Sequence, residues 1–136
     1  MNPRLAGPAD LEAVFALRYR VFVVEQQVPV ELERDELDAV SDHAAHLVDG
    51  RVVGTGRLLP DGTIGRMAVD PAHRRAGIGA RVLALLEQRA RERGMTRVEL
   101  HAQSHALGFY ERAGWSAFGK PYDEAGIEHL SMRKDL

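Results

Sequence analysis

Residues 63–102 constrain the fold more than any other part of the chain, because the period of their apolar residues changes twice. TIGRMAV alternates as a strand does, the apolar residues after Asp70 recur at helical spacing, and TRVELHA alternates again. Two strands joined through a helix in this way form a parallel pair with a right-handed crossover. We expect the apolar face of this helix to pack on the sheet and its polar face, which includes Glu87, to be solvated.

An antiparallel meander is predicted before this unit. HLV and RVV flank Asp49-Gly50, a strong two-residue hairpin signal, and a second turn at residues 60–62 joins RVVGTGRLL to TIGRMAV. Gly54 and Gly56 lie inside a strand pattern, which indicates a bulge or a close approach to the backbone. Three antiparallel strands therefore end at Val69.

The remaining elements follow from caps and chain breakers. Asp10 can cap the first helix, which ends near Pro29, and residues 3–6 can form a very short strand before it. Ser104 can cap a short helix over HALGFYERA, and WSAFG and EHLSMRK are typical of a closing hairpin. Residues 31–42 are rich in carboxylates, and we expect a solvated loop there.

Together these elements predict one domain over residues 1–136, of the α/β or α+β class. Its sheet is mixed but mostly antiparallel, and the expected order of elements is α-β-β-β-α-β-α-β-β.

Composition narrows the function classes. The formal charge is −2 and the sequence pI is about 6.3, which gives no general reason to expect binding to nucleic acid or to an anionic membrane. The chain has no cysteine, so disulfides, thiolate metal sites and cysteine nucleophiles are excluded. The first residues lack the profile of a signal peptide, and no apolar run is long enough to cross a bilayer. We therefore expect a cytoplasmic protein.

The strongest functional signal is HRRAGIG at residues 73–79, where the central helix begins. Glycine lets backbone N–H groups approach a ligand closely, and the first turn of a helix leaves its N–H groups free for an anion. Arg74 and Arg75 add positive charge at the same end. The segment therefore predicts a phosphate-binding loop.

Three kinds of phosphate-binding loop can be compared with this segment. A P-loop requires GxxxxGK[ST], but the only lysines of the chain are Lys120 and Lys134. A dinucleotide fingerprint requires GxGxxG in the first turn of a parallel unit, whereas GIG is followed here by ARV and preceded by an antiparallel meander. The pattern R/Q-x-x-G-x-G/A fits residues 74–79 at every fixed position.

This pattern, after a strand and a VDP turn, resembles the acetyl-CoA site of the GNAT superfamily of N-acetyltransferases. LRYRVFVVEQ, LHAQSHALGFYERAGW and GIEHLSM resemble its ElaA-like branch, and the resemblance extends over nearly the whole chain. It implies the GNAT fold, with a central parallel strand pair that splays apart and helices on both faces of the sheet. It also implies that acetyl-CoA is the co-substrate.

The resemblance further implies where coenzyme A is held. The pantetheine arm is expected to lie between the two splayed strands and to bond to the backbone of the first, and the pyrophosphate is expected at the amides of residues 75–80. Ser104 stands where many members have an asparagine that contacts the cofactor. The residues predicted to bind the cofactor are Met67, Ala68, Val69, Arg74, Arg75, Ala76, Gly77, Ile78, Gly79, Ala80, Ser104, Phe109 and Tyr110.

Acetyl transfer to an amine needs an acid that protonates the departing thiolate. Tyr110 is predicted to be this acid, because similar proteins place a tyrosine near the sulfur at this point. The alternative is that Phe109 and Tyr110 simply pack under the helix, and we favour packing for Phe109 only. A strand N–H near Ala68 or Val69 can stabilise the charge that develops on the carbonyl oxygen.

The amine must also lose a proton before it attacks. Glu25 is the predicted base, because similar proteins place this stretch beside the acceptor pocket. His101, Glu99, His129 and a water relay stay open as alternatives.

Other features carry less weight. His43 and His46 with Asp42, and His101 with His105, suggest metal ligands, but no HExxH motif or cysteine accompanies them, so we predict no metal site. The acidic segment at residues 31–42 can select a cationic acceptor.

We predict an N-acetyltransferase that moves an acetyl group from acetyl-CoA to a primary amine of a small molecule or peptide. Direct transfer in a ternary complex is favoured, because the chain has no cysteine to carry the acetyl group. The first alternative is a non-catalytic acyl-CoA-binding or regulatory module, and the second is a nucleotide-binding module. A homodimer through the closing strands is a further possibility.

Overall fold

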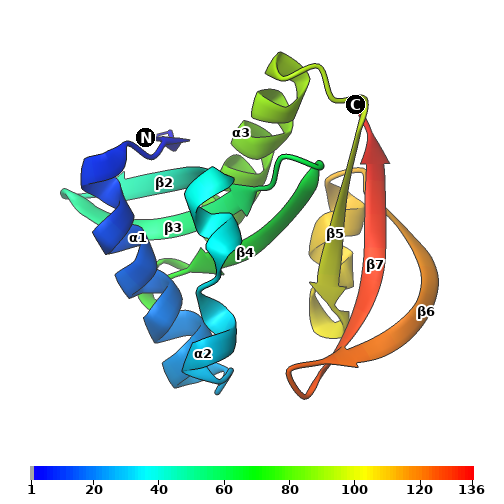
Figure 1. Cartoon of the computed structure of the whole chain (residues 1–136), viewed down its shortest axis with the longest axis horizontal. Helices are drawn as coiled ribbons and strands as arrows, with labels where there is room; N and C mark the ends of the chain where they lie inside the picture. The colour runs from blue at the N-terminus through cyan, green and yellow to red at the C-terminus, as the bar shows by residue number, and fades with distance from the viewer. Residues whose placement is uncertain (1) are drawn as a thin grey trace.

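Seven strands form one mixed sheet in the computed structural model, which describes residues 2–136. Their order across the sheet is β1-β2-β3-β4-β5-β7-β6, and only β4 and β5 pair in parallel (Figure 1). The strands are β1 (Arg4–Leu5), β2 (Asp42–Val48), β3 (Arg51–Leu58), β4 (Thr63–Val69), β5 (Arg97–Gln103), β6 (Ser116–Glu124) and β7 (Ile127–Asp135). The predicted mixed sheet, the meander, the closing hairpin and the short strand within residues 3–6 are confirmed.

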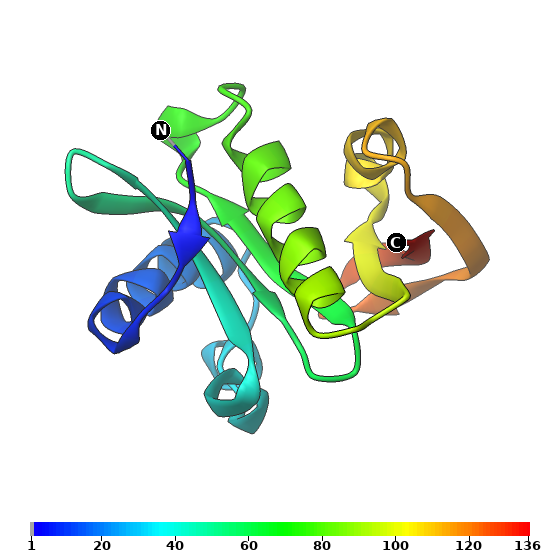
Figure 2. The same cartoon turned by 90° about the horizontal axis from the view of Figure 1, so that it is seen from above.

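Helices cover both faces of this sheet, as predicted. α3 (Ile78–Glu92) and α4 (Leu107–Arg112) lie on one side, and α1 (Leu11–Arg18) and α2 (Val30–Glu33) lie on the other (Figure 2). α1 continues without a break into a π-helical segment, η2 (Tyr19–Glu25). No helix within residues 2–136 is long and apolar enough to cross a membrane.

The sheet separates two hydrophobic cores. The larger lies between the sheet and α3 and α4, and the smaller lies beneath α1. Along β5 every second residue from Val98 to Ala102 is buried in the larger core. Because side chains alternate along a strand, Glu99, His101 and Gln103 face the side of α1 and α2.

Gly54 and Gly56 lie where α3 packs directly on β3. A Cβ on Gly54 would lie 2.5 Å from Cγ2 of Ile78, and a Cβ on Gly56 would lie 2.9 Å from Cδ1 of Leu86, both on α3. Both distances are too short for a real contact, so glycine is what lets the helix approach this closely. The register of β3 against β2 also shifts beside Gly54. Both structural features that the glycines predict are therefore present.

The prediction of a solvated loop at residues 31–42 is wrong. The segment contains α2 and a 3-10 helix, η3 (Glu36–Val40), and three arginines from α1, β3 and β4 contact three of its carboxylates. We call this set the arginine–carboxylate cluster; its members are Arg18, Arg57, Arg66, Glu33, Asp35 and Asp38.

The cluster is largely buried. Arg18 donates to Glu33 at 2.5 Å and to Asp38 at 2.7 Å, and the side chains of Arg18 and Glu33 are 1% and 4% exposed. Arg57 donates to Asp35 at 2.7 Å and to Asp38 at 2.8 Å. The protein itself neutralises these three carboxylates, which leaves the selection of a cationic acceptor by this segment a prediction.

Two local predictions also fail. Asp10 makes no capping bond to α1; its carboxylate accepts from the N–H of Gly7 at 3.0 Å and from Arg4 at 2.9 Å, which closes the turn before the helix. Glu87 is buried rather than solvated, because it accepts from Trp115 Nε1 at 3.1 Å and from Lys134 Nζ at 2.7 Å. These partners are remote in sequence, so helical periodicity cannot reveal them.

Candidate functional site

β4 and β5 pair at one end only. The ladder joins Thr63 to Glu99 and Ile64 to Leu100, and beyond these rungs the strands diverge (Figure 1). A bulge in β4 lies where the divergence begins, since Arg66 has a φ of 52° and the register against β3 shifts there. The predicted splayed parallel pair is therefore confirmed.

The divergence leaves part of the β4 backbone facing an open side. Asp70 N–H donates to Val53 O at 2.8 Å on β3, so the alternation of an antiparallel ladder turns the N–H and C=O of Val69 away from β3 and toward β5. Arg74 Nε donates to Val69 O at 3.0 Å from that side. Of the three residues predicted to bond the cofactor here, Val69 thus turns its backbone groups to the opening.

The predicted phosphate-binding loop lies at the N-terminal end of α3. Gly77 is the residue before the helix and has a φ of 78°, and Arg75 has a φ of 66°. Residues 74–77 are exposed, and the amides of the first helical turn that follow have no carbonyl partner earlier in the helix. The loop therefore presents free N–H groups to solvent, which suits an anion.

Phe109 and Gly79 bring α4 beside this loop. A Cβ on Gly79 would lie 3.3 Å from Cζ of Phe109 and 3.7 Å from Cγ2 of Val69. Gly79 thus sits where the start of α3, the end of β4 and α4 meet. A larger side chain there would push into the region between the loop and the strand opening.

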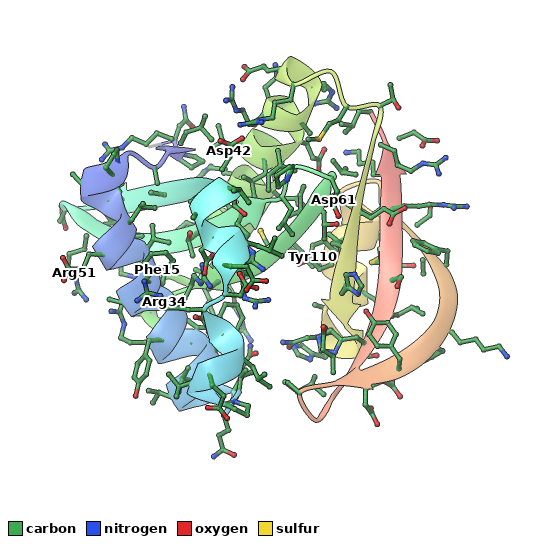
Figure 3. All side chains as sticks on the ribbon, viewed as in Figure 1. Phe15, Arg34, Asp42, Arg51, Asp61 and Tyr110 are labelled. Carbon is green, nitrogen blue, oxygen red and sulfur yellow. The ribbon has the colours of Figure 1, made fainter. Side chains whose placement is uncertain are left out.

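Tyr110 lies on α4, and Figure 3 labels it at the opening between β4 and β5. The ring makes edge contacts with Phe109 and Trp115, at centroid distances of 5.0 Å and 6.2 Å. Burial raises the pKa of Tyr110 to about 12. The hydroxyl therefore keeps its proton throughout the neutral range and can act as a hydrogen-bond donor.

Glu25 and Arg74 form a bidentate ion pair across the site. Both guanidinium Nη atoms donate to the Glu25 carboxylate at 2.7 Å, so the end of η2 is tied to the first residue of the phosphate-binding loop. The hydrogen bond from Arg74 lowers the pKa of Glu25. A lower pKa means a weaker proton acceptor, so the pair works against the role predicted for Glu25.

A second contact joins η2 to β5 on the side of α1. Gln103 donates to Gln26 at 2.8 Å, next to the Glu25–Arg74 pair in the chain. Ser104 begins the 3-10 helix η5 (Ser104–Ala106), but its hydroxyl donates to Glu128 on β7 at 2.8 Å rather than capping the helix. While it donates to Glu128, this hydroxyl can still accept a hydrogen bond, so the predicted cofactor contact of Ser104 stays a prediction.

Hydrogen bonds to protein groups are made by His43, His101 and His129. His43 bonds Asp38 O at 2.9 Å, and His46 is buried, with no partner for its Nδ1 within residues 2–136. His101 bonds Tyr122, and His129 bonds Ile127 O at 2.7 Å. Within residues 2–136 no three His, Asp or Glu side chains gather closely enough to hold a metal ion.

Comparison with known proteins assigns the family. A family model described as acetyltransferase (GNAT) domain matches residues 8–136. The chain belongs to the GNAT acetyltransferase family. The uncharacterized N-acetyltransferase YjcF of Bacillus subtilis (strain 168) is 39% identical over 93% of each protein.

Two solved structures share the GNAT fold closely. An acyl-CoA N-acyltransferase from Pseudomonas aeruginosa is 34% identical, covers 98% of each chain and has a TM-score of 0.86. Escherichia coli ElaA is 27% identical, covers 98% of each chain and has a TM-score of 0.84. The resemblance to the GNAT superfamily and to ElaA is thus confirmed.

Sequence reasoning missed three side chains around the opening of this GNAT domain: Gln26, Gln103 and Tyr122. The alternation of TRVELHAQ places Gln103 on the same face as His101, so that residue could have been found. The contacts of Gln26 and Tyr122 depend on how remote segments meet, and no local pattern reveals them.

Proposed function

We propose that this GNAT acetyltransferase moves an acetyl group from acetyl-CoA to a primary amine of a small molecule or peptide, in a direct ternary complex. The observation that carries the proposal is the divergence of β4 from β5 directly beside the phosphate-binding loop. The open edge of β4 can bond to polar amides, and the free amides at the start of α3 can bind a pyrophosphate. Together they suit a long molecule that carries amides at one end and a pyrophosphate at the other.

The residues present fit coenzyme A. The open backbone of Met67 to Val69 can bond to the pantetheine amides, and the amides of residues 75–80 can bind the pyrophosphate. Arg75 is exposed at the loop and adds a positive charge. Phe109 and Tyr110 then lie beside the pantetheine arm, on the side of the larger core.

The chain supplies three kinds of help to the transfer. A base accepts a proton from the acceptor ammonium, and the free amine then forms the C–N bond while the C–S bond breaks. The N–H of Val69 can bond to the carbonyl oxygen as negative charge develops on it. Tyr110 donates a proton to the departing sulfur and regains one from the new amide nitrogen through solvent, so one proton is released overall.

Calorimetric titration with acetyl-CoA, and with NADH and ATP in parallel, tests the proposal. Binding in the micromolar range that is selective for acetyl-CoA is expected. Equal binding of all three compounds, or none, would contradict it. Release of free thiol with a panel of amines then separates an enzyme from the alternative, a non-catalytic acyl-CoA-binding or regulatory module.

The role of Glu25 as the base stays a prediction. If Glu25 is the base, Glu25→Gln abolishes the acidic limb of the pH–rate profile. The homodimer and the cytoplasmic location also stay predictions.

A further inference from the structure

His101 is the first residue of β5 beyond the parallel ladder with β4. Leu100 makes the last rung, to Ile64, so His101 lies where the two strands begin to separate. Its side chain is exposed, on the face opposite the buried Leu100 and Ala102. Tyr110 belongs to the core on the other face. The two side chains therefore lie on opposite sides of the opening.

Two neighbouring strands fix the position of His101. Nδ1 of His101 bonds the hydroxyl of Tyr122, which reaches from β6 across β7. Ser131, which stands opposite His101 on β7, also hydrogen-bonds Tyr122. The ring of Tyr122 stacks on His129 at a centroid distance of 6.0 Å.

We propose that His101 is the base that receives the proton of the acceptor ammonium, and that Tyr122 is the positioning residue that holds its ring. This proposal rests on the proposed function, and it assigns the base that the proposed function does not assign. In this arrangement Nδ1–H donates to Tyr122, which leaves Nε2 unprotonated and directed away from the bond with Tyr122. Nε2 takes one proton from the ammonium and later releases it to solvent, while the amine keeps its electron pair for the attack.

Geometry favours His101 over Glu25. Both oxygens of Glu25 are engaged by Arg74, whereas only one ring nitrogen of His101 has a protein partner among residues 2–136. Imidazole is also the side chain whose ordinary pKa lies closest to neutral pH, which suits proton transfer in both directions.

The position of His101 opposite Tyr110 also suits direct transfer of the acetyl group from the cofactor to the amine. An amine that arrives from the side of α1 meets His101 first, and the sulfur that leaves can meet Tyr110 on the side of α3 and α4. Gln26 and Gln103, which bond at 2.8 Å, border the same side. Base and acid thus act on opposite faces of one opening, and neither has to move past the cofactor.

The charged and titratable groups around His101 are few. Glu99 is two residues away on the same face of β5, and Arg133 stands opposite Glu99 on β7. Tyr122 reaches it from β6, and His129, with Glu124 at 3.6 Å from its Nε2, lies behind Tyr122. Burial raises the pKa of Tyr122, and the hydrogen bond with Ser131 offsets only part of this rise. Tyr122 therefore keeps its proton and stays a neutral partner for His101.

The first test reads the tautomer of His101 in protein labelled with nitrogen-15 and bound to acetyl-CoA. Long-range proton–nitrogen NMR spectra at pH 8 are expected to show the Nδ1–H form of His101 in the wild type and a mixture of tautomers in Tyr122→Phe. A wild-type protein in the Nε2–H form overturns the proposal, because that nitrogen could not then accept a proton.

The second test compares benzylamine, which is charged at neutral pH, with aniline, which is uncharged and needs no base. His101→Gln should slow acetylation of benzylamine by at least about 100-fold and leave aniline nearly unaffected. His105→Gln is the matched control, since His105 is exposed on η5, and it should change neither rate.

The outcomes separate the two proposals. Equal losses with both amines, or a loss with Glu25→Gln in place of His101→Gln, overturn the assignment of His101. A wild-type protein that does not bind acetyl-CoA overturns the proposed function itself. Binding without turnover of either amine rejects the base and supports the non-catalytic alternative.

Discussion

Burial decides the protonation state of the Tyr110 hydroxyl, which is predicted to serve the departing sulfur. Its pKa of about 12 keeps the hydroxyl protonated near neutral pH, so it is always ready to donate a hydrogen bond to the sulfur, but it is also a weaker acid than an ordinary phenol. Tyr110→Phe keeps the ring and its contacts with Phe109 and Trp115, so acetyl-CoA affinity should hold while kcat falls by roughly 10- to 100-fold. Steady-state kinetics with calorimetry check this, and a normal kcat would remove Tyr110 from the mechanism.

Gly79 sets the space at the phosphate-binding loop. A Cβ there already comes within 3.3 Å of Phe109, so Gly79→Leu should displace Phe109 and weaken acetyl-CoA binding by at least about 10-fold. Gly50→Asn is the control, because Gly50 lies in a remote hairpin, has a φ of 76° that asparagine tolerates, and faces open space. Equal affinity of Gly79→Leu and wild type in calorimetry would reject the loop as the pyrophosphate site.

At the scale of elements, the arginine–carboxylate cluster attaches α2 and η3 to the sheet. Burial raises the pKa of Asp38, but Arg18 lowers it further, to about 2. The folded state thus binds the proton more weakly than the unfolded chain does. Its contribution to stability is complete above about pH 4 and is lost as the pH falls toward 2, a difference of about 2 kcal/mol.

Asp38→Asn should therefore lower the free energy of unfolding by about 2 kcal/mol at pH 7, because Arg18 and Arg57 each lose one of their two carboxylate partners, while Glu33 and Asp35 remain. The difference in the free energy of unfolding between the variant and the wild type should become smaller as the pH falls from 4 to 2. Urea unfolding across this range checks both statements, and a gap that is independent of pH would contradict the assigned role of Asp38.

The same cluster shows why the sequence predicts some elements and not others. Strands, helices and the glycine turn before α3 depend on residues a few positions apart, so periodicity and Gly77 or Gly79 suffice to place them. Arg18 and Glu33, or Glu25 and Arg74, meet only after the sheet has formed. The sequence around a carboxylate does not show whether a remote arginine will pair with it in the folded protein. From the sequence alone, the acidic segment therefore cannot be distinguished from a solvated loop.

At the scale of the molecule, a short ladder and the buried side chain of Glu87, a contact we call the clamp, join the two halves of the sheet alongside the larger core. β4 and β5 share two rungs, and Glu87 on α3 adds bonds to Trp115 and to Lys134 on β7. Glu87→Ala leaves the buried indole N–H of Trp115 without its acceptor and Lys134 with Ala113 O alone, so stability should fall by about 2 kcal/mol or more. Glu92→Ala, on the exposed face of α3, should change it by less than about 0.5 kcal/mol. Equal effects in urea unfolding would show that the clamp adds nothing.

The outer strand of the sheet has a consequence for assembly. Between Phe118 and Tyr122 the register of β6 against β7 shifts, with Gly119 at a φ of 76° and Pro121 lacking a backbone donor. The row of exposed N–H and C=O groups on this edge is therefore broken, which hinders another chain from adding a strand to it. If two copies associate, we therefore expect them to pack through the faces of their sheets, because the edge of β6 does not readily accept a further strand.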